Sequence, residues 1–240
     1  DGESNPQNTS GGNTASASSS SSSGSGGSGG LGPVGQVSGP IKRYSYTFDI
    51  ESALARTELS IDVQDPGGNC YSAACKPDML SDITWNNAPA DSSSADGLKL
   101  TACGPSVVPG QPLMVGATTT VPEQTYLGLD VGFSHSKNLA GGQFTYLLSW
   151  VGGCSRFSPC DTNPAELAEF HYEITHPAGM NVLCPGLLKA GSTSTQCDIT
   201  GTLAPTYSGF ALAADAMWER KVFGNAAGVD LVFYEVPGGK

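Results

Sequence analysis

The chain has 240 residues, with 22 acidic side chains against 11 basic ones and a formal net charge of −11. Binding to nucleic acid or to an anionic membrane surface needs clustered Lys and Arg, so this charge balance disfavours both partners. The sequence also contains no apolar run that approaches the ~20 residues of a membrane span.

Residues 1–40 consist mostly of Gly, Ser, Asn, Thr and Pro, with a run of serines at 18–23. So few apolar side chains cannot offset the entropy of ordering the chain, which predicts a disordered Gly/Ser-rich tether over 1–40. The remaining segment, 41–240, is long enough for one all-β domain. A Ser/Gly-rich start of this kind is similar in style to mature bacterial lipoproteins, so any membrane attachment is expected only through a lipid on a residue before Asp1.

From Ile41 onward, apolar and polar residues alternate with the period of two that predicts β-strands. In the first strand Tyr44, Tyr46 and Phe48 alternate with polar residues. The further predicted strands are 58–63, 79–85, 98–102, 113–121, 126–133, 144–150, 168–176, 206–213, 218–223 and 229–234. Only 164–168 suggests a short helix. Strands at this spacing predict an all-β fold, an antiparallel sandwich or saddle.

Seven cysteines indicate an oxidising compartment, because disulfides persist mainly outside the cytosol. The sequence has no C-x-x-C pair, so the spacing does not indicate a zinc cluster. One pair of cysteines flanks a predicted hairpin, and another brackets a short loop. The favoured pairs are Cys70–Cys103, Cys154–Cys160 and Cys184–Cys197, which leaves Cys75 over. Sequence alone does not fix connectivity, and buried free thiols are the alternative.

The order of features between 144 and 186 is specific. A predicted strand leads to the loop SRFSPCDTNP at 155–164, then to the strand AEFHYEITH at 168–176 and the turn Pro177-Ala178-Gly179. This order resembles the end of the N-terminal β domain of the aminopeptidase N family of zinc metallopeptidases. In that family a Phe-Pro-Cys loop leads into a strand and a turn, whereas here Ser158 precedes Pro159-Cys160 and Asp161 follows directly.

The resemblance implies an accessory β domain, and the segment 228–237 is similar to the family's last strand, which runs into the catalytic domain. Catalysis there needs H-E-x-x-H on a helix, because two His one turn apart bind zinc and the Glu polarises water. His135, His171 and His176 lack that spacing, and none is followed by Glu. We therefore predict no catalytic residue, metal ligand or cofactor in this chain. Zinc is expected in a catalytic domain of the same parent protein, which would be the partner and would bind the peptide substrate.

In this family the β domain lends a Gln or Glu to hold the substrate's free α-amino group, from the strand ahead of the Pro-Cys loop. The corresponding positions fall at 148–150, where neither residue type occurs. The resemblance thus gives Ser149 and Trp150 as candidate substrate-binding residues. Trp150 either lines the cleft or packs in the core.

Two functions stay open from the sequence. The first is a non-catalytic accessory domain of an exported zinc aminopeptidase-like protein, which shapes the cleft that receives peptide N-termini. Its expected location is the bacterial envelope surface, the periplasm or the medium. The alternative is a free-standing surface β-sandwich that acts as a binding or adhesion module on a flexible stalk.

Overall fold

The computed structural model describes residues 35–65, 67–76, 80–96, 98–108, 110–121, 123–126, 129–148, 153–163, 165–205 and 211–237. Within these ranges the fold is all β, apart from one 3₁₀ turn, η2 (Cys154–Arg156). The described part of the chain has no helix long and apolar enough to cross a membrane. The strands are β1 (Ile41–Asp49), β2 (Leu54–Ile61), β3 (Cys70–Ala74), β4 (Leu80–Trp85), β5 (Ala88–Pro89), β6 (Ser92–Asp96), β7 (Lys99–Cys103), β8 (Leu113–Thr120), β9 (Gln124–Tyr126), β10 (Leu129–Lys137), β11 (Gln143–Leu148), β12 (Leu167–Thr175), β13 (Asn181–Leu183), β14 (Leu187–Lys189), β15 (Ser194–Pro205), β16 (Ala211–Asp215), β17 (Glu219–Ala226) and β18 (Val229–Glu235).

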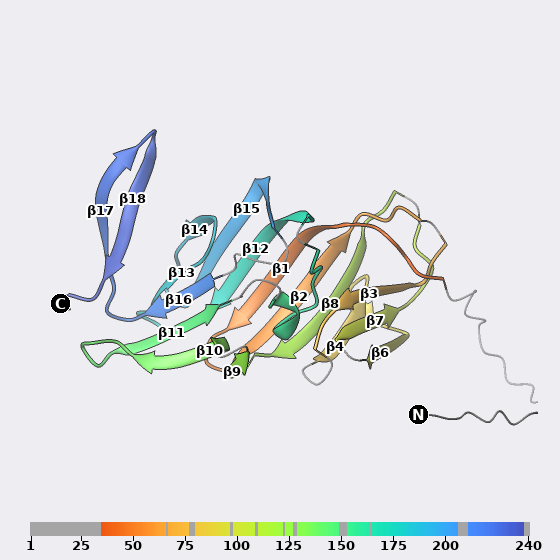
Figure 1. The fold of residues 1–240 in the computed structure, drawn as a ribbon, viewed down its shortest axis with the longest axis horizontal. Helices are drawn as coiled ribbons and strands as arrows, with labels where there is room; N and C mark the ends of the chain where they lie inside the picture. The colour runs from red at the N-terminus through yellow and green to blue at the C-terminus, as the bar shows by residue number, and fades with distance from the viewer. Residues whose placement is uncertain are drawn as a thin grey trace, which may run out of the picture. The chain divides into compact units, whose positions relative to one another are not determined.

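The largest sheet has eight strands in the order β14-β15-β12-β1-β2-β8-β4-β5 (Figure 1). Its neighbours are antiparallel with one exception: β1 and β12 run parallel, with Tyr46 opposite Tyr172. The predicted antiparallel architecture is confirmed, and β1–β12 is the parallel pair within this sheet. A parallel pair needs a crossover connection, and here the chain between β1 and β12 contains most of the other strands.

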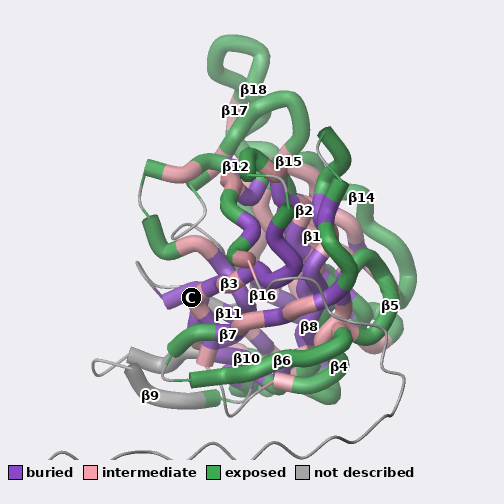
Figure 2. Tube along the Cα trace, turned by 90° about the vertical axis from the view of Figure 1, so that its right-hand side faces the viewer, coloured by how far each residue is buried: buried purple, intermediate pink, exposed green. Residues whose placement is uncertain are grey.

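One face of this sheet carries a buried row of aromatic side chains, which we call the aromatic ladder: Tyr44, Tyr46, Phe48, Phe170 and Tyr172. Their exposed fractions lie between 0% and 4%. Figure 2 shows buried stretches of the backbone trace beside the labels β1 and β2. The rings stack across the parallel pair, with centroids 5.1 Å apart for Tyr44–Phe170 and 5.6 Å apart for Tyr46–Tyr172. Burial raises the pKa of both Tyr46 and Tyr172, so these phenols stay neutral.

The second sheet has five strands in the order β13-β16-β11-β10-β9. Phe133, Leu147 and Leu212 on its inner face belong to the same hydrophobic core as the aromatic ladder. The Phe133 ring meets Phe48 edge-on, with centroids 5.8 Å apart. Two sheets that bury one face each against a common core form a sandwich, as predicted. A three-stranded sheet, β3-β7-β6, and the hairpin β17–β18 complete the fold.

The folded unit begins before Ile41. Val37 is 4% exposed within the core, and its N–H donates to the Cys70 carbonyl at 2.7 Å. Gln36 forms a parallel bridge with Cys70. The sequence predicts a tether over 1–40, whereas Gln36 and Val37 belong to the folded unit, which therefore starts earlier than predicted. The rest of the predicted tether, 1–34, lies outside the described residues.

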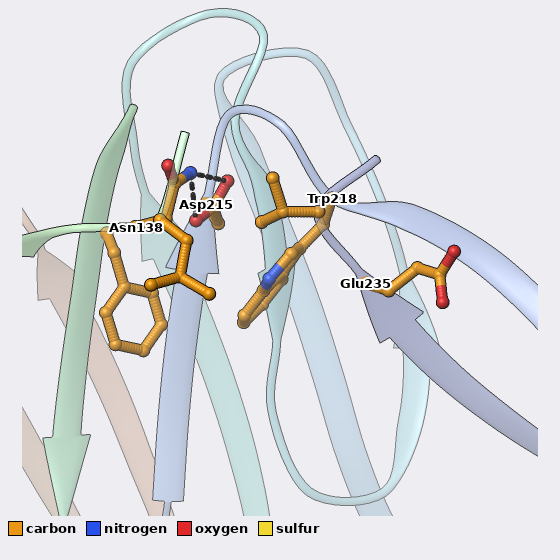
Figure 3. Close-up of a pocket in the computed structure, with 7 residues that line it drawn as sticks. Asn138, Asp215, Trp218 and Glu235 are labelled. Carbon is orange, nitrogen blue, oxygen red and sulfur yellow. Dashed lines mark hydrogen bonds between the residues drawn. The ribbon is translucent and has the colours of Figure 1, made fainter. Parts of the chain in front are cut away.

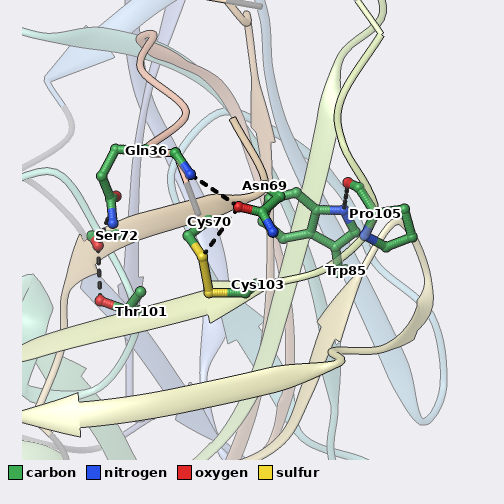
Figure 4. The surroundings of a disulfide bond; sticks show 9 residues. Gln36, Asn69, Cys70, Ser72, Trp85, Thr101, Cys103 and Pro105 are labelled. Atoms are coloured by element: carbon green, nitrogen blue, oxygen red, sulfur yellow. Dashed lines mark hydrogen bonds between the residues drawn. A yellow bond between two sulfur atoms is a disulfide. The ribbon is translucent and has the colours of Figure 1, made fainter. Parts of the chain in front are cut away.

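The structure contains the three favoured disulfides: Cys70–Cys103, Cys154–Cys160 and Cys184–Cys197. Cys70 and Cys103 face each other across β3 and β7, and Figure 4 shows Asn69 and Trp85 beside them. Asn69 accepts a bond from the Gly35 N–H, and the Trp85 indole donates to the Pro105 carbonyl at 3.1 Å. Cys75 is free and buried, and burial raises the pKa of its thiol to about 12. It is therefore a packed apolar group and not a reactive thiolate.

One local prediction was wrong. The suggested helix at 164–168 is absent from its described residues: the Glu166 N–H closes a turn on the Asn163 carbonyl, and β12 begins at Leu167. The hairpin predicted between Cys184 and Cys197 is present as β14 and the start of β15. The rest of β15 was not predicted, because it includes few apolar side chains at the spacing of a strand. The strand β15 is held by β12 and β14 on its two edges.

Candidate interaction surface

Part of the outward face of the five-stranded sheet, along β11, β16 and β13, is apolar, which is unusual for a solvent-facing antiparallel sheet. On β10 the same face carries Ser134 and Ser136. Along β11, Thr145 and Leu147 are buried in the core, so Phe144 and Tyr146 point the other way and are half-buried. Across the pair, Tyr146 lies opposite Ala213 of β16. This part of the face therefore presents aromatic rings beside small side chains.

Two open pockets lie on this face and meet at Phe144. The first has a volume of about 460 Å³, and its lining includes Phe144, Tyr146, Leu183 and Ala213. The second has a volume of about 400 Å³ and is shown in Figure 3. Its lining residues are Asn138, Leu139, Phe144, Asp215, Trp218, Glu235 and Val236. We call the two pockets together the apolar groove.

A buried carboxylate holds the rim of the groove in place. Asp215 is 0% exposed, and the Asn138 side-chain N–H₂ donates to both of its oxygens at 3.1 and 2.8 Å (Figure 3). The Met217 N–H donates to the same carboxylate at 2.6 Å. The side-chain Oδ1 of Asn138 in turn accepts the backbone N–H groups of Ala140 and Gly142. The carboxylate is thus satisfied by fixed donors, and its role is to tie the β10–β11 turn to the β16–β17 turn.

Trp218 forms a wall of the second pocket. Its ring centroid lies 5.8 Å from that of Phe144 and 6.0 Å from that of Tyr234. The Asn181 side chain donates to the Trp218 carbonyl at 2.9 Å, which fixes the backbone as well. Because ring packing and a hydrogen bond both restrain this residue, the pocket exists without a ligand.

The hairpin β17–β18 adjoins the groove, since β17 starts directly after Trp218 and β18 ends directly before Val236. Phe223 and Phe233 lie on one face of it, with ring centroids 6.3 Å apart. Leu231 shares that face, because it is two residues from Phe233 on the same strand. We call these side chains, with Val229, the hairpin face. Their exposed fractions are 80% for Phe223, 64% for Val229, 48% for Leu231 and 40% for Phe233.

The outward face of the eight-stranded sheet is polar instead. His171 of β12 lies opposite Asp198 of β15, and its Nδ1 is 2.6 Å from an Asp198 carboxylate oxygen. Lys189 approaches the other oxygen at 3.7 Å. The hydrogen bond from His171 is the main cause that lowers the pKa of Asp198, and the nearby positive charges of Lys189 and Arg43 act in the same direction.

The other two histidines have separate partners. His135 is exposed and lies 3.0 Å from the Thr145 hydroxyl. His176 is buried, with Nδ1 2.9 Å from the Pro177 carbonyl and Nε2 3.0 Å from the Thr195 hydroxyl. Within the described ranges, no three His, Cys, Asp or Glu side chains gather closely enough to hold a metal ion.

The candidate substrate-binding residues Ser149 and Trp150 lie outside the described residues. The loop that follows them is anchored on the aromatic ladder: the Asp161 N–H donates to the Tyr44 hydroxyl at 2.9 Å. The groove itself was missed from the sequence. Alternation at 144–148 predicted the strand β11, but nothing in the sequence indicates which of its two faces stays uncovered.

No protein-family model matches this chain, and no curated protein matches it. Solved structures do match. The M1 zinc metallopeptidase from Deinococcus radiodurans matches with a TM-score of 0.57 and 18% identity, over 81% of this chain and 46% of that chain. A point mutant of the enzyme from the same organism, bound to a Tyr-Ser-Ala substrate, matches with a TM-score of 0.58 and 18% identity, over 82% of this chain and 47% of that chain.

A mutant described as a two-domain M1 zinc metallopeptidase bound to L-arginine matches with a TM-score of 0.57 and 19% identity, over 77% of this chain and 44% of that chain. The chain thus has the fold of a part of these metallopeptidases and spans about half the length of the structures that it matches. At this level of identity the similarity is one of fold, and fold alone does not assign an activity.

Proposed function

We propose that this chain is the non-catalytic β domain of an exported zinc aminopeptidase-like protein, in which it shapes the cleft that receives peptide N-termini. One observation carries the proposal. The fold match covers 82% of this chain but only 47% of a metallopeptidase chain, which is the proportion expected of one domain out of two.

Two further features support this function. The loop and strand at 155–179, whose sequence resembles the family's β domain, form η2 and β12 beside the core. The apolar groove is a preformed surface with no cover among the described residues. In this proposal the zinc ion and its ligands belong to a separate catalytic domain of the same protein. That domain is the direct partner, and the peptide substrate reaches this chain only at the shared cleft.

The export part of the proposal rests on the cysteines. Three disulfides join six of the seven, and such bonds persist in oxidising compartments. We propose an envelope-surface, periplasmic or extracellular location, with attachment through an N-terminal lipid.

The experiment uses the complete product of the gene. We expect its reading frame to encode H-E-x-x-H after Lys240, and the purified product to release N-terminal residues from short peptides. A zinc chelator should abolish this activity, and zinc should restore it. The control is the product in which Gln replaces the motif's Glu. A complete product that has no such motif and no peptidase activity would refute the proposal. It would favour the alternative of a free-standing binding module, which a screen against glycans and peptides would then test.

A further inference from the structure

Two neighbouring apolar surfaces are left uncovered by the residues that the structure describes. The groove presents Phe144, Tyr146 and Leu183 on a sheet face that would ordinarily be polar. Leu139, at the rim, is 84% exposed. An isolated two-stranded hairpin is marginal in water, and here it also exposes the four apolar side chains of the hairpin face. Contiguous apolar surface of this kind marks interaction sites.

The groove and the base of the hairpin adjoin. Phe144 lines both pockets of the groove. The second pocket ends on Trp218 and Val236, the residues that directly precede and follow the hairpin. A body that fills this pocket therefore contacts the base of the hairpin as well.

The available area argues against the hairpin acting alone. At roughly 200 Å² for a whole Phe side chain, Phe223 and Phe233 offer about 240 Å² between them. A stable interface takes roughly 800 Å² from each partner. The hairpin face by itself falls short of that, so the occupant must also cover the groove.

Charge and chain length identify the occupant. Two copies of this chain would bring together two bodies of formal charge −11, which opposes self-association. A symmetric dimer would also place one concave groove against another. The matched metallopeptidases include two-domain proteins of which this chain covers less than half. A second domain of one polypeptide is already held close, so it binds at a high effective concentration.

We propose that the apolar groove and the hairpin face form one interface for the metal-binding domain of the same protein, with the hairpin as a clasp over that domain. The metal-binding domain places apolar side chains in the groove. The Leu139 side chain, at the groove's rim, inserts between apolar side chains of that domain. This inference rests on the proposed function, and it adds the surface through which the two domains associate.

The test compares amide hydrogen exchange in the complete gene product with exchange in this 240-residue chain. We expect at least a tenfold slowing, in the complete product, at the β10–β11 turn and along β17 and β18. The variants Leu139→Asp and Phe223→Asp should remove this protection, because each buries a charge at the interface. Both side chains are largely exposed here, at 84% and 80%, so the 240-residue chain should keep its stability with either change. Leu98→Asp is the control, since Leu98 is 52% exposed on the β6–β7 turn of another sheet.

The possible results distinguish a failure of the proposed interface from a failure of the proposed function. A zinc peptidase whose groove and hairpin amides exchange as fast as in the 240-residue chain would overturn the inference and leave the proposed function in place. A complete product without a metal-binding domain would overturn both. Protection that appears in the 240-residue chain as its concentration rises would show that a second copy is the occupant, which also overturns the inference.

Discussion

The aromatic ladder and the apolar groove arise from the same sequence pattern and have opposite surroundings. In β1, Tyr44, Tyr46 and Phe48 alternate with polar residues, and all three are at most 2% exposed. In β11, Phe144 and Tyr146 alternate in the same way, yet they line an open groove. The comparison teaches that alternation decides which side chains share a face of a strand. Whether that face is covered depends on elements far away in the sequence.

Replacing one aromatic residue from each region tests the comparison most directly. Phe48→Ala should destabilise the chain by about 3–5 kcal/mol, because it leaves a cavity beside Tyr46 and Phe133. Phe144→Ala should cost about 1 kcal/mol or less in the 240-residue chain, since the side chain already borders solvent. Urea unfolding measures both. Equal losses would mean that the groove is closed in solution.

The Cys184–Cys197 disulfide connects the two regions, because Cys184 lines the groove and Cys197 is buried in the core. Replacing both cysteines with Ala should cost about 3 kcal/mol by loop entropy, for a sequence separation of 13. Removing Cys154–Cys160 in the same way, with a separation of 6, should cost about 2 kcal/mol. Thermal unfolding without reductant gives the order, and a reversed order would contradict the loop-entropy account.

Two buried threonines, Thr57 and Thr119, differ in whether the side-chain hydroxyl makes a hydrogen bond. Thr57 is fully buried, and its hydroxyl is the single buried side-chain polar atom among the described residues that has no hydrogen bond. Thr57→Val should therefore stabilise the fold by about 1 kcal/mol. Thr119, on the neighbouring strand β8, donates to the Phe157 carbonyl at 2.5 Å, so Thr119→Val should destabilise by about 1–2 kcal/mol. If both changes had the same sign in chemical denaturation, burial alone would govern this face.

These contrasts explain how far the sequence could predict the fold. Local alternation was enough for β1 and β12, and cysteine spacing favoured the pairs that the structure contains. The parallel pairing of β1 with β12 joins residues more than a hundred positions apart, which no local pattern encodes. Val37 was missed because the few apolar residues in the Gly- and Pro-rich segment 31–40 do not follow the period of two of a strand.

The groove was harder to predict for the same reason. Its rim depends on the contact between Asn138 and Asp215, 77 positions apart, and an isolated Asn and Asp are ordinary surface residues in a sequence. The resemblance pointed to positions 148–150, which begin at Leu148, the last residue of the groove strand β11. It could not show that the aromatic residues a few positions earlier face outward.

The smallest expected change in stability concerns the His171–Asp198 pair, on the polar outward face of the eight-stranded sheet. His171→Ala removes the hydrogen bond that is the main cause of the lowered Asp198 pKa, so that pKa should rise toward its ordinary value. Because the folded pKa is lowered, the pair stabilises the fold above the ordinary Asp pKa of about 4, and this contribution is lost as pH falls through the lowered value. The loss of folding free energy in His171→Ala at neutral pH should be below ~1 kcal/mol, as for most surface pairs.

Lys189→Met is the matched control. Lys189 is 63% exposed, and its Nζ lies 3.7 Å from Asp198 Oδ2, so its removal should change the Asp198 pKa less. NMR titration of the Asp198 carboxyl measures both shifts. If Lys189→Met gave the larger one, general electrostatic attraction and not the hydrogen bond would hold this carboxylate ionised.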